Sequence, residues 1–150
     1  MRSRKLARRA LVVLGIVMVL SLIAPQAAHA TTYNEKFSSF LINGYDRNPR
    51  GLRSLALNEF VSNIARSHSA QMARAGRIYH SNLSSVGSRI SGWRVLGENV
   101  GMGPDLRVLN QAFMNSPGHR ANLLCKCFRY VGIGVVQSGR TYFVTHIFYG

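Results

Sequence analysis

Acidic residues are scarce in this sequence: five stand among its 150 residues, against nineteen lysines and arginines. All five acids follow position 30, whereas five of the basic residues precede it, so residues 31–150 carry a formal charge of +9. Such an excess attracts polyanions by Coulomb forces. The basic residues are scattered singly, however, and do not cluster as in a nucleic-acid-binding motif. The scarcity of acids therefore excludes a neutral surface and predicts affinity for anionic lipid or wall surfaces, while the scattered placement of the basic residues argues against specific nucleic-acid recognition.

Cysteine is nearly absent as well, because Cys125 and Cys127 are the only two in the chain. This pair supplies too few ligands for a cysteine-based metal site. Outside the cytoplasm two cysteines usually pair, but with a single residue between them they close only a small ring, since disulfide geometry is demanding. A strained Cys125–Cys127 disulfide and a bond to another chain both remain open.

Internal repeats, low-complexity stretches and linkers are also missing from residues 31–150. A segment of this length is sufficient for one domain with one modest hydrophobic core. We therefore expect a single domain.

The first thirty residues form a targeting pattern and are set aside from the fold. Basic residues at positions 2–9 precede an apolar run from Ala10 to Ala24, which Pro25 and Ala28-His29-Ala30 follow. A positive head, an apolar stretch and a small-x-small site are the layout of a cleavable secretory signal. A retained membrane anchor is the alternative, but the run is shorter than the roughly twenty residues that a spanning helix needs. We predict cleavage after Ala30 and a secreted or envelope-associated mature domain, exported by the general secretory or the twin-arginine route.

The first part of the mature region has the apolar spacing of helices. Apolar residues recur every three or four positions over 35–45 and over 57–75, and Gly76 stops the second of these helices. A third helix is expected to begin at its cap, Asp105, and to end at Pro117-Gly118.

The final third changes to the composition of strands. Residues 131–136 and 141–148 are rich in β-branched and aromatic types and are separated by a tight-turn sequence, which predicts a hairpin. A shorter strand is expected over 94–100. Helices first and strands last favour an α+β fold in which helices pack on a small antiparallel sheet.

Three polar residues stand in contexts where a side chain can face a cleft: His80, Glu98 and His119 each follow an element end or a glycine. Two imidazoles and a carboxylate can bind a divalent cation such as zinc with one position open. The same three residues can instead form a proton-transfer network, or hold neighbouring loops in place by hydrogen bonds. His68 and His146 lie within a predicted helix and a predicted strand, and are interpreted as packing or surface residues.

Four short motifs occur in a fixed order along the chain. They are His80-Ser81-Asn82-Leu83, Gly97-Glu98-Asn99-Val100, Ser116-Pro117-Gly118-His119-Arg120-Ala121-Asn122-Leu123-Leu124 and Gly132-Ile133-Gly134-Val135. Together they resemble the ordered motifs of bacterial SCP-like extracellular domains in the CAP superfamily, which includes cysteine-rich secretory, antigen 5 and pathogenesis-related proteins. The resemblance covers about residues 37–148. It implies a three-layer α-β-α sandwich with a small antiparallel sheet, and a surface cleft lined by two histidines and two glutamates.

The resemblance also assigns the cleft residues. It implies that the two histidines are His80 and His119 and that the first glutamate is Glu98. Ser116 stands where relatives carry the second glutamate. A neutral hydroxyl offers less to a cation than a carboxylate does, so we expect any divalent metal, such as zinc, to bind weakly.

The family resemblance favours a non-enzymatic extracellular binding module, whose partner is a small apolar ligand or a component of the cell envelope. The alternative is a metal-dependent hydrolase of peptide or wall material, with Glu98 as the base. The missing second acid, the absence of His-Glu-x-x-His spacing and the lack of a credible nucleophile stand against this enzyme. A third hypothesis is an envelope-adhesion protein that acts through its charge alone.

Overall fold

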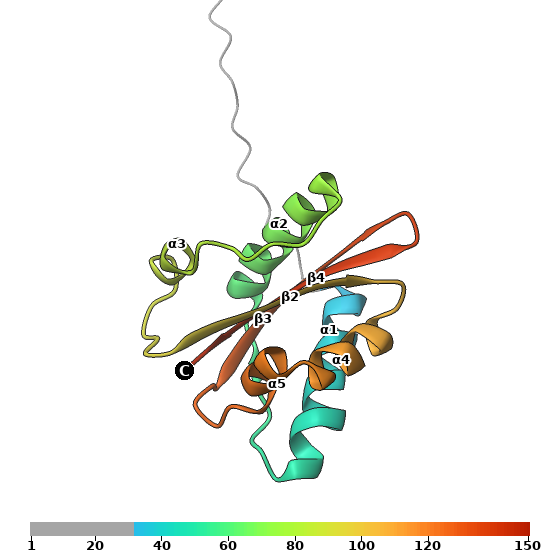
Figure 1. The fold of residues 1–150 in the computed structure, drawn as a ribbon. Coiled ribbons are helices and arrows are strands. Elements are labelled where there is room, and N and C mark those ends of the chain that lie inside the picture. The colour runs from blue at the N-terminus through green and yellow to red at the C-terminus, as the bar shows by residue number, and fades with distance from the viewer. Residues whose placement is uncertain (1–31) are drawn as a thin grey trace, which may run out of the picture.

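Two layers of helices enclose a four-stranded sheet in the computed structural model, which describes residues 32–150 (Figure 1). The predicted signal peptide, residues 1–30, lies outside the described residues. The helical elements are α1 (Tyr33–Phe40), the π-helix η1 (Leu41–Arg47), the 3₁₀ turn η2 (Asn48–Arg50), α2 (Glu59–Ala75), α3 (Leu83–Gly87), α4 (Leu106–Asn115) and α5 (Pro117–Leu124). The strands are β1 (Ala56–Leu57), β2 (Leu96–Gly103), β3 (Tyr130–Ser138) and β4 (Thr141–Tyr149).

The two faces of the sheet carry different helices, as the expected three-layer α+β sandwich requires. Helix α2 packs on β3 and β4 on one face, while α1, α4 and α5 lie on the other (Figure 1). The alternation of β3 fits this arrangement, because Ile133 points into the core beneath α1 and α4, whereas Gly132 and Gly134 point at α2. A Cβ atom at either glycine would collide with the backbone of α2. The Gly-x-Gly motif therefore allows the close approach of helix and sheet.

The sheet has the order β1-β3-β4-β2 and is mixed, which corrects the expectation of a purely antiparallel sheet. The predicted hairpin is present as β3 and β4, and Gly139 occupies its turn with a φ of 58°. Strand β2 pairs antiparallel with β4. The two-residue strand β1, however, pairs parallel with Tyr130 and Val131 of β3. Two residues carry no readable periodicity, so the sequence offered no signal for this strand.

Most helix ends follow the capping residues that the sequence indicated. Asp105 caps α4 by accepting from Arg107 N and Val108 N, and Gly76 ends α2 in the left-handed conformation with a φ of 63°. The predicted role of Pro117 is wrong: α4 ends at Asn115, and Pro117 opens a further helix, α5. Proline suits the first helical turn because that turn needs no N–H donor. Within residues 32–150, no helix combines the length and the apolar character needed to cross a membrane.

The two cysteines follow α5 directly. They are joined to each other by a disulfide, with their Cα atoms 5.2 Å apart. Of the two pairings that the sequence left open, the structure contains the Cys125–Cys127 bond.

Candidate functional site

The buried carboxylate of Glu98 is the centre of the predicted cleft. Its side chain projects from β2 and has no exposed surface. Oε2 accepts hydrogen bonds from His80 Nδ1 at 2.8 Å and from Ser81 N at 3.0 Å, and Oε1 accepts one from Ser81 Oγ at 2.5 Å. Three donors therefore satisfy a charge that would otherwise be costly to bury.

His80 stands at the surface and depends on Glu98 for its orientation. Its side chain is 62% exposed, and it lies in the loop between α2 and α3. A carboxylate only accepts hydrogen bonds, so the contact places the proton on Nδ1 and leaves Nε2 as the basic nitrogen. A carboxylate behind an imidazole fixes the ring's tautomer and orientation. The structure thus brings His80 and Glu98 together, with Glu98 behind the ring.

His119 lies on α5 and packs its ring edge-to-face against Phe113, with ring centroids 5.0 Å apart. Burial, and then the nearby charge of His80, lower the pKa of His119. The imidazole is therefore predominantly neutral at pH 7 and able to accept a hydrogen bond or a cation. The charge of His80 is thus close enough to act on the ring of His119.

Two asparagines that the sequence analysis had not singled out as site residues connect α5 to β2. Asn99 Nδ2 donates to the backbone carbonyl of His119 at 3.0 Å. Asn122 Nδ2 donates to Asn99 Oδ1 at 2.9 Å and to the carbonyl of Glu98 at 3.2 Å. These bonds fix the backbone that carries His119 relative to Glu98. Their positions within the Gly-Glu-Asn and His-Arg-Ala-Asn motifs were the signal that sequence reasoning could have used.

Ser116 occupies the junction of α4 and α5. It is half-buried, its backbone N–H donates to the carbonyls of Ala112 and Phe113, and its carbonyl accepts from Arg120 N at 2.8 Å. Among the described residues, no hydrogen bond joins its hydroxyl to a histidine or an acid. The position of the missing second glutamate is thus a helix junction in this chain.

The three residues predicted as metal ligands differ in whether their donor atoms are available. Within residues 32–150, no group of three or more histidine, cysteine, aspartate or glutamate side chains is arranged to hold a metal ion. Both oxygens of Glu98 are engaged by His80 and Ser81. The imidazoles of His80 and His119 are the donors that remain.

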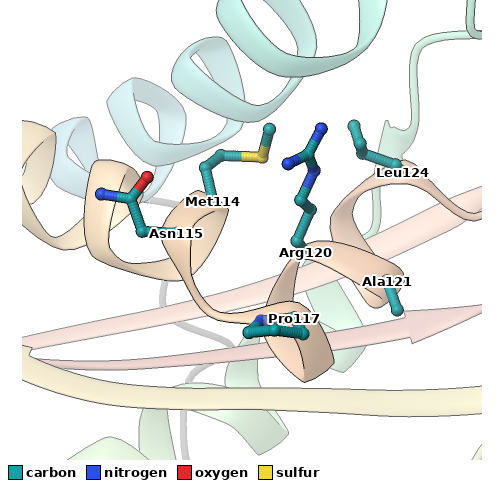
Figure 2. Close-up of a pocket in the computed structure, with 6 residues that line it drawn as sticks. All are labelled: Met114, Asn115, Pro117, Arg120, Ala121 and Leu124. Carbon is teal, nitrogen blue, oxygen red and sulfur yellow. The ribbon is translucent and has the colours of Figure 1, made fainter.

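A groove lies between η1, η2, α4 and α5; a groove between helices is one of the ligand sites that a binding module can use, but its residues were not predicted from the sequence. One cavity of about 490 Å³ and another of about 300 Å³ share Met114 in their walls, and we call the two together the Met114 groove. The larger cavity is lined by Met114, Asn115, Pro117, Arg120, Ala121 and Leu124. Figure 2 shows the Arg120 side chain rising from α5 between the ends of Met114 and Leu124. Volumes of this size suit small-molecule ligands.

The charges along the Met114 groove are mainly positive. Arg50 and Arg107 line the smaller cavity, and Arg120 lines the larger one. The one acid in these walls, Asp46, is 4% exposed and accepts a hydrogen bond from Asn110 Nδ2 at 2.9 Å. Burial raises the pKa of Asp46, while its hydrogen bond from Asn110 and the charge of Arg50 act in the opposite direction. The groove can therefore receive an apolar body together with an anionic group.

The fold and these motifs define an SCP-type domain. The family model of the cysteine-rich secretory protein family, CAP, matches residues 41–149, and the chain belongs to this family. The chain is 32% identical over 101 residues to the uncharacterized protein YkwD of Bacillus subtilis, a match that covers 63% of this chain and 39% of YkwD.

Two solved structures extend the comparison. An extracellular protein with an SCP domain from Bacillus anthracis has 29% identity and a TM-score of 0.67, over 77% of this chain and 40% of that protein. An outer surface protein of Borrelia burgdorferi has 16% identity and a TM-score of 0.71, over 81% of this chain and 95% of that protein, and shows the shared fold alone. The chain thus spans about two fifths of the length of its two Bacillus relatives.

Proposed function

We propose that this chain is an exported, non-enzymatic binding module whose ligand occupies the Met114 groove. Export is supported by the secretory pattern of residues 1–30 and by the related structures, which are described as extracellular or outer surface proteins. The observation that carries the ligand proposal is a groove with both apolar and basic walls, in which Arg120 lies between Met114 and Leu124. The ligand class is an amphiphile with an apolar chain and a carboxylate or phosphate group.

The engagement of Glu98 argues against the hydrolase alternative. A general base must reach the proton that it removes, but this carboxylate has no exposed surface and already accepts three hydrogen bonds. Ser116 lacks a partner among the described side chains that would activate it as a nucleophile. The role we assign to Glu98 is to orient His80.

A weak divalent-cation site is a second role that the orientation of His80 favours. His80 Nδ1 is held by Glu98, so Nε2 is the ring nitrogen available to a cation. The neutral ring of His119 is the natural second donor. Two imidazoles form an incomplete ligand set, which is why we propose weak binding of zinc.

Attraction to anionic wall or lipid surfaces is a third contribution. Three of the five acids, Glu35, Asp46 and Glu98, are buried, so the exposed surface carries a larger positive excess than the composition suggests. Salt screens exposed charges, so adhesion of this kind is lost at high ionic strength. Binding inside the groove retains its apolar contribution there.

The test of the groove uses two charge insertions on the same helix. Met114→Glu places a carboxylate at the point shared by the two cavities, whereas Val108→Glu places one on an exposed position of α4. The purified proteins are extracted with organic solvent and the co-purified amphiphiles are quantified by mass spectrometry. We expect an anionic amphiphile in the wild type and the Val108→Glu variant and its loss from Met114→Glu. An empty wild-type extract, or equal amounts in all three, contradicts the proposal, as does hydrolysis of wall or peptide substrates that Glu98→Gln abolishes.

A further inference from the structure

The Cys125–Cys127 disulfide has little to contribute as a structural cross-link. It encloses a single residue, Lys126. The stabilisation that a disulfide provides by restricting the unfolded chain grows with the length of the enclosed loop. A loop of this size therefore adds little to stability. Stabilisation alone does not account for the disulfide, so a chemical role is the alternative.

The disulfide lies at the surface, where a second molecule can reach one of its sulfurs. Cys127 and Lys126 are exposed, and Cys125 is half-buried at the end of α5. Exposed disulfides are more readily reduced than buried structural ones. An incoming thiolate meets Cys127 first.

The backbone is arranged to stabilise the other sulfur as a leaving group. The N–H of Cys127 donates to Cys125 Sγ with a nitrogen–sulfur distance of 3.2 Å. When the disulfide bond breaks, this donor is in place for the negative charge that develops on Cys125. A thiolate that is stabilised leaves faster.

A buried cation lies beneath the same residue. The Arg47 side chain is 1% exposed, and its Nη1 donates to the carbonyls of Leu123 at 2.7 Å and Cys125 at 3.0 Å. In the part of the chain that the structure describes, Arg47 forms no ion pair with a carboxylate. Its charge counters the carbonyl dipoles at the end of α5, which would otherwise repel a Cys125 thiolate. Lys126 adds a second positive charge, and positive neighbours favour thiolates.

We propose that Cys125–Cys127 is a redox-active disulfide that oxidises dithiols outside the cytoplasm. A thiolate of the dithiol attacks Cys127 Sγ and forms a mixed disulfide, while the electron pair of the broken bond leaves on Cys125 Sγ, which takes up a proton. The second thiolate of the dithiol then attacks its own partner sulfur and releases Cys127, which is protonated in turn. The dithiol loses two electrons and two protons and becomes a disulfide, and the two cysteines become thiols. This activity is independent of the Met114 groove.

The first experiment measures how easily the disulfide is reduced. The purified protein is equilibrated in buffers of reduced and oxidised glutathione, quenched with an alkylating reagent and analysed by mass. We expect half of the protein to be reduced in buffers near the reduction potential of glutathione itself, where structural disulfides stay oxidised. A disulfide that stays oxidised across these buffers overturns the proposal, and so does a wild-type protein whose cysteines are joined between chains.

The second experiment tests which sulfur is attacked. A short pulse of glutathione at neutral pH is followed by acid quenching and peptide mapping of the mixed disulfide. Attack at Cys127 predicts the adduct predominantly there, whereas an equal distribution or an adduct on Cys125 contradicts the geometry. Lys126→Gln is expected to slow the reaction several-fold, and Arg140→Gln, on the distant hairpin turn, is the matched control that leaves it unchanged.

Two serine variants separate a redox role from a structural one. In Cys127→Ser the free Cys125 keeps the backbone N–H and Arg47 beside it, so its alkylation rate should rise at a lower pH than the ordinary thiol pKa of about 8.5. The double variant Cys125→Ser, Cys127→Ser should unfold at nearly the wild-type temperature. An ordinary Cys125 thiol, or a large loss of thermal stability in the double variant, would show that the disulfide is merely structural.

Discussion

His80 Nδ1 lies 2.8 Å from Glu98 Oε2, although the loop after α2 and the strand β2 carry these residues eighteen positions apart. The contact joins an exposed imidazole to a carboxylate without exposed surface. The backbone N–H and the hydroxyl of Ser81 also donate to Glu98. These bonds hold the loop that carries His80 against β2. This arrangement differs from that of a general base in a solvent-filled active site.

Glu98→Gln should therefore destabilise the fold. The amide retains the shape of the side chain but loses the charge, and it turns one acceptor into a donor that faces the groups of His80 and Ser81. Losing charge-assisted hydrogen bonds at a buried group costs about 1–3 kcal/mol. Denaturant unfolding at pH 7 measures this loss. A variant as stable as the wild type would mean that the network contributes nothing.

Acid should weaken the fold through His146. This ring is buried, its Nε2 lies 3.0 Å from Ser38 Oγ, and burial, with a smaller effect of the charge on His119, lowers its pKa to about 3. The unfolded chain binds a proton near pH 6.5, while the folded chain binds it only near pH 3. The stabilisation is thus complete above about pH 6.5 and is lost progressively as the pH falls toward 3.

We expect this single group to remove about 2 kcal/mol of unfolding free energy between pH 7 and pH 5. His146→Gln lowers stability at pH 7 but should show a smaller decrease between the two pH values. The other titrating groups are present in both proteins, so the difference between the two pH profiles isolates His146. Identical decreases in the wild type and the variant would refute the assignment.

The approach of α2 to β3 predicts a severe effect at one glycine and a mild one at another. Gly134→Ala brings a methyl group into the backbone of Ala65 and Arg66, which cannot yield as a flexible side chain would. We expect a loss of more than about 3 kcal/mol or failure to fold. Gly118→Ala on α5, where open space surrounds the position, is the control and should be neutral or slightly stabilising. Equal melting temperatures for the two variants would contradict the packing described.

Zinc binding tests the two imidazoles. We expect weak binding at pH 7 that decreases at about pH 5, because a protonated imidazole cannot coordinate a cation. The double variant His80→Ala, His119→Ala should lose most of this affinity. Calorimetric titration measures the zinc affinity. An unchanged affinity in the double variant would contradict the proposed cation site.

Periodic signals explain which parts of the fold were predictable. Helix α2 spans seventeen residues and the β3–β4 hairpin pairs nine on each side, so their apolar repeats are long enough to read. Helices α3 and α5 have five and eight residues. The sequence predicts no helix at the first and indicates Pro117-Gly118, at the start of the second, as a helix end. Short elements of this kind depend on the packing around them more than on their own pattern.

The candidate site also has a part that local motifs predicted and a part that depends on how the helices pack. His80, Glu98 and His119 were identified because they stand in local motifs that resemble a family. The residues of the Met114 groove were not identified, because Arg50, Arg107 and Arg120 come from three different helical elements and share a space only after these pack together. Sequence likewise could not tell that Glu98 would be enclosed, since its burial depends on the loop of Ser81.

The most direct test of the account is a calorimetric titration of the purified protein with dodecanoate and with dodecanol, which share an alkyl chain and differ in charge. A charge-assisted contact at the groove is worth about 1.4 kcal/mol or more, which corresponds to at least tenfold tighter binding of dodecanoate. Arg120→Gln should reduce dodecanoate to the affinity of the alcohol, and Arg140→Gln should leave both unchanged. Absence of binding, equal affinity for the two ligands, or an Arg120→Gln variant that binds dodecanoate like the wild type would contradict the proposed groove.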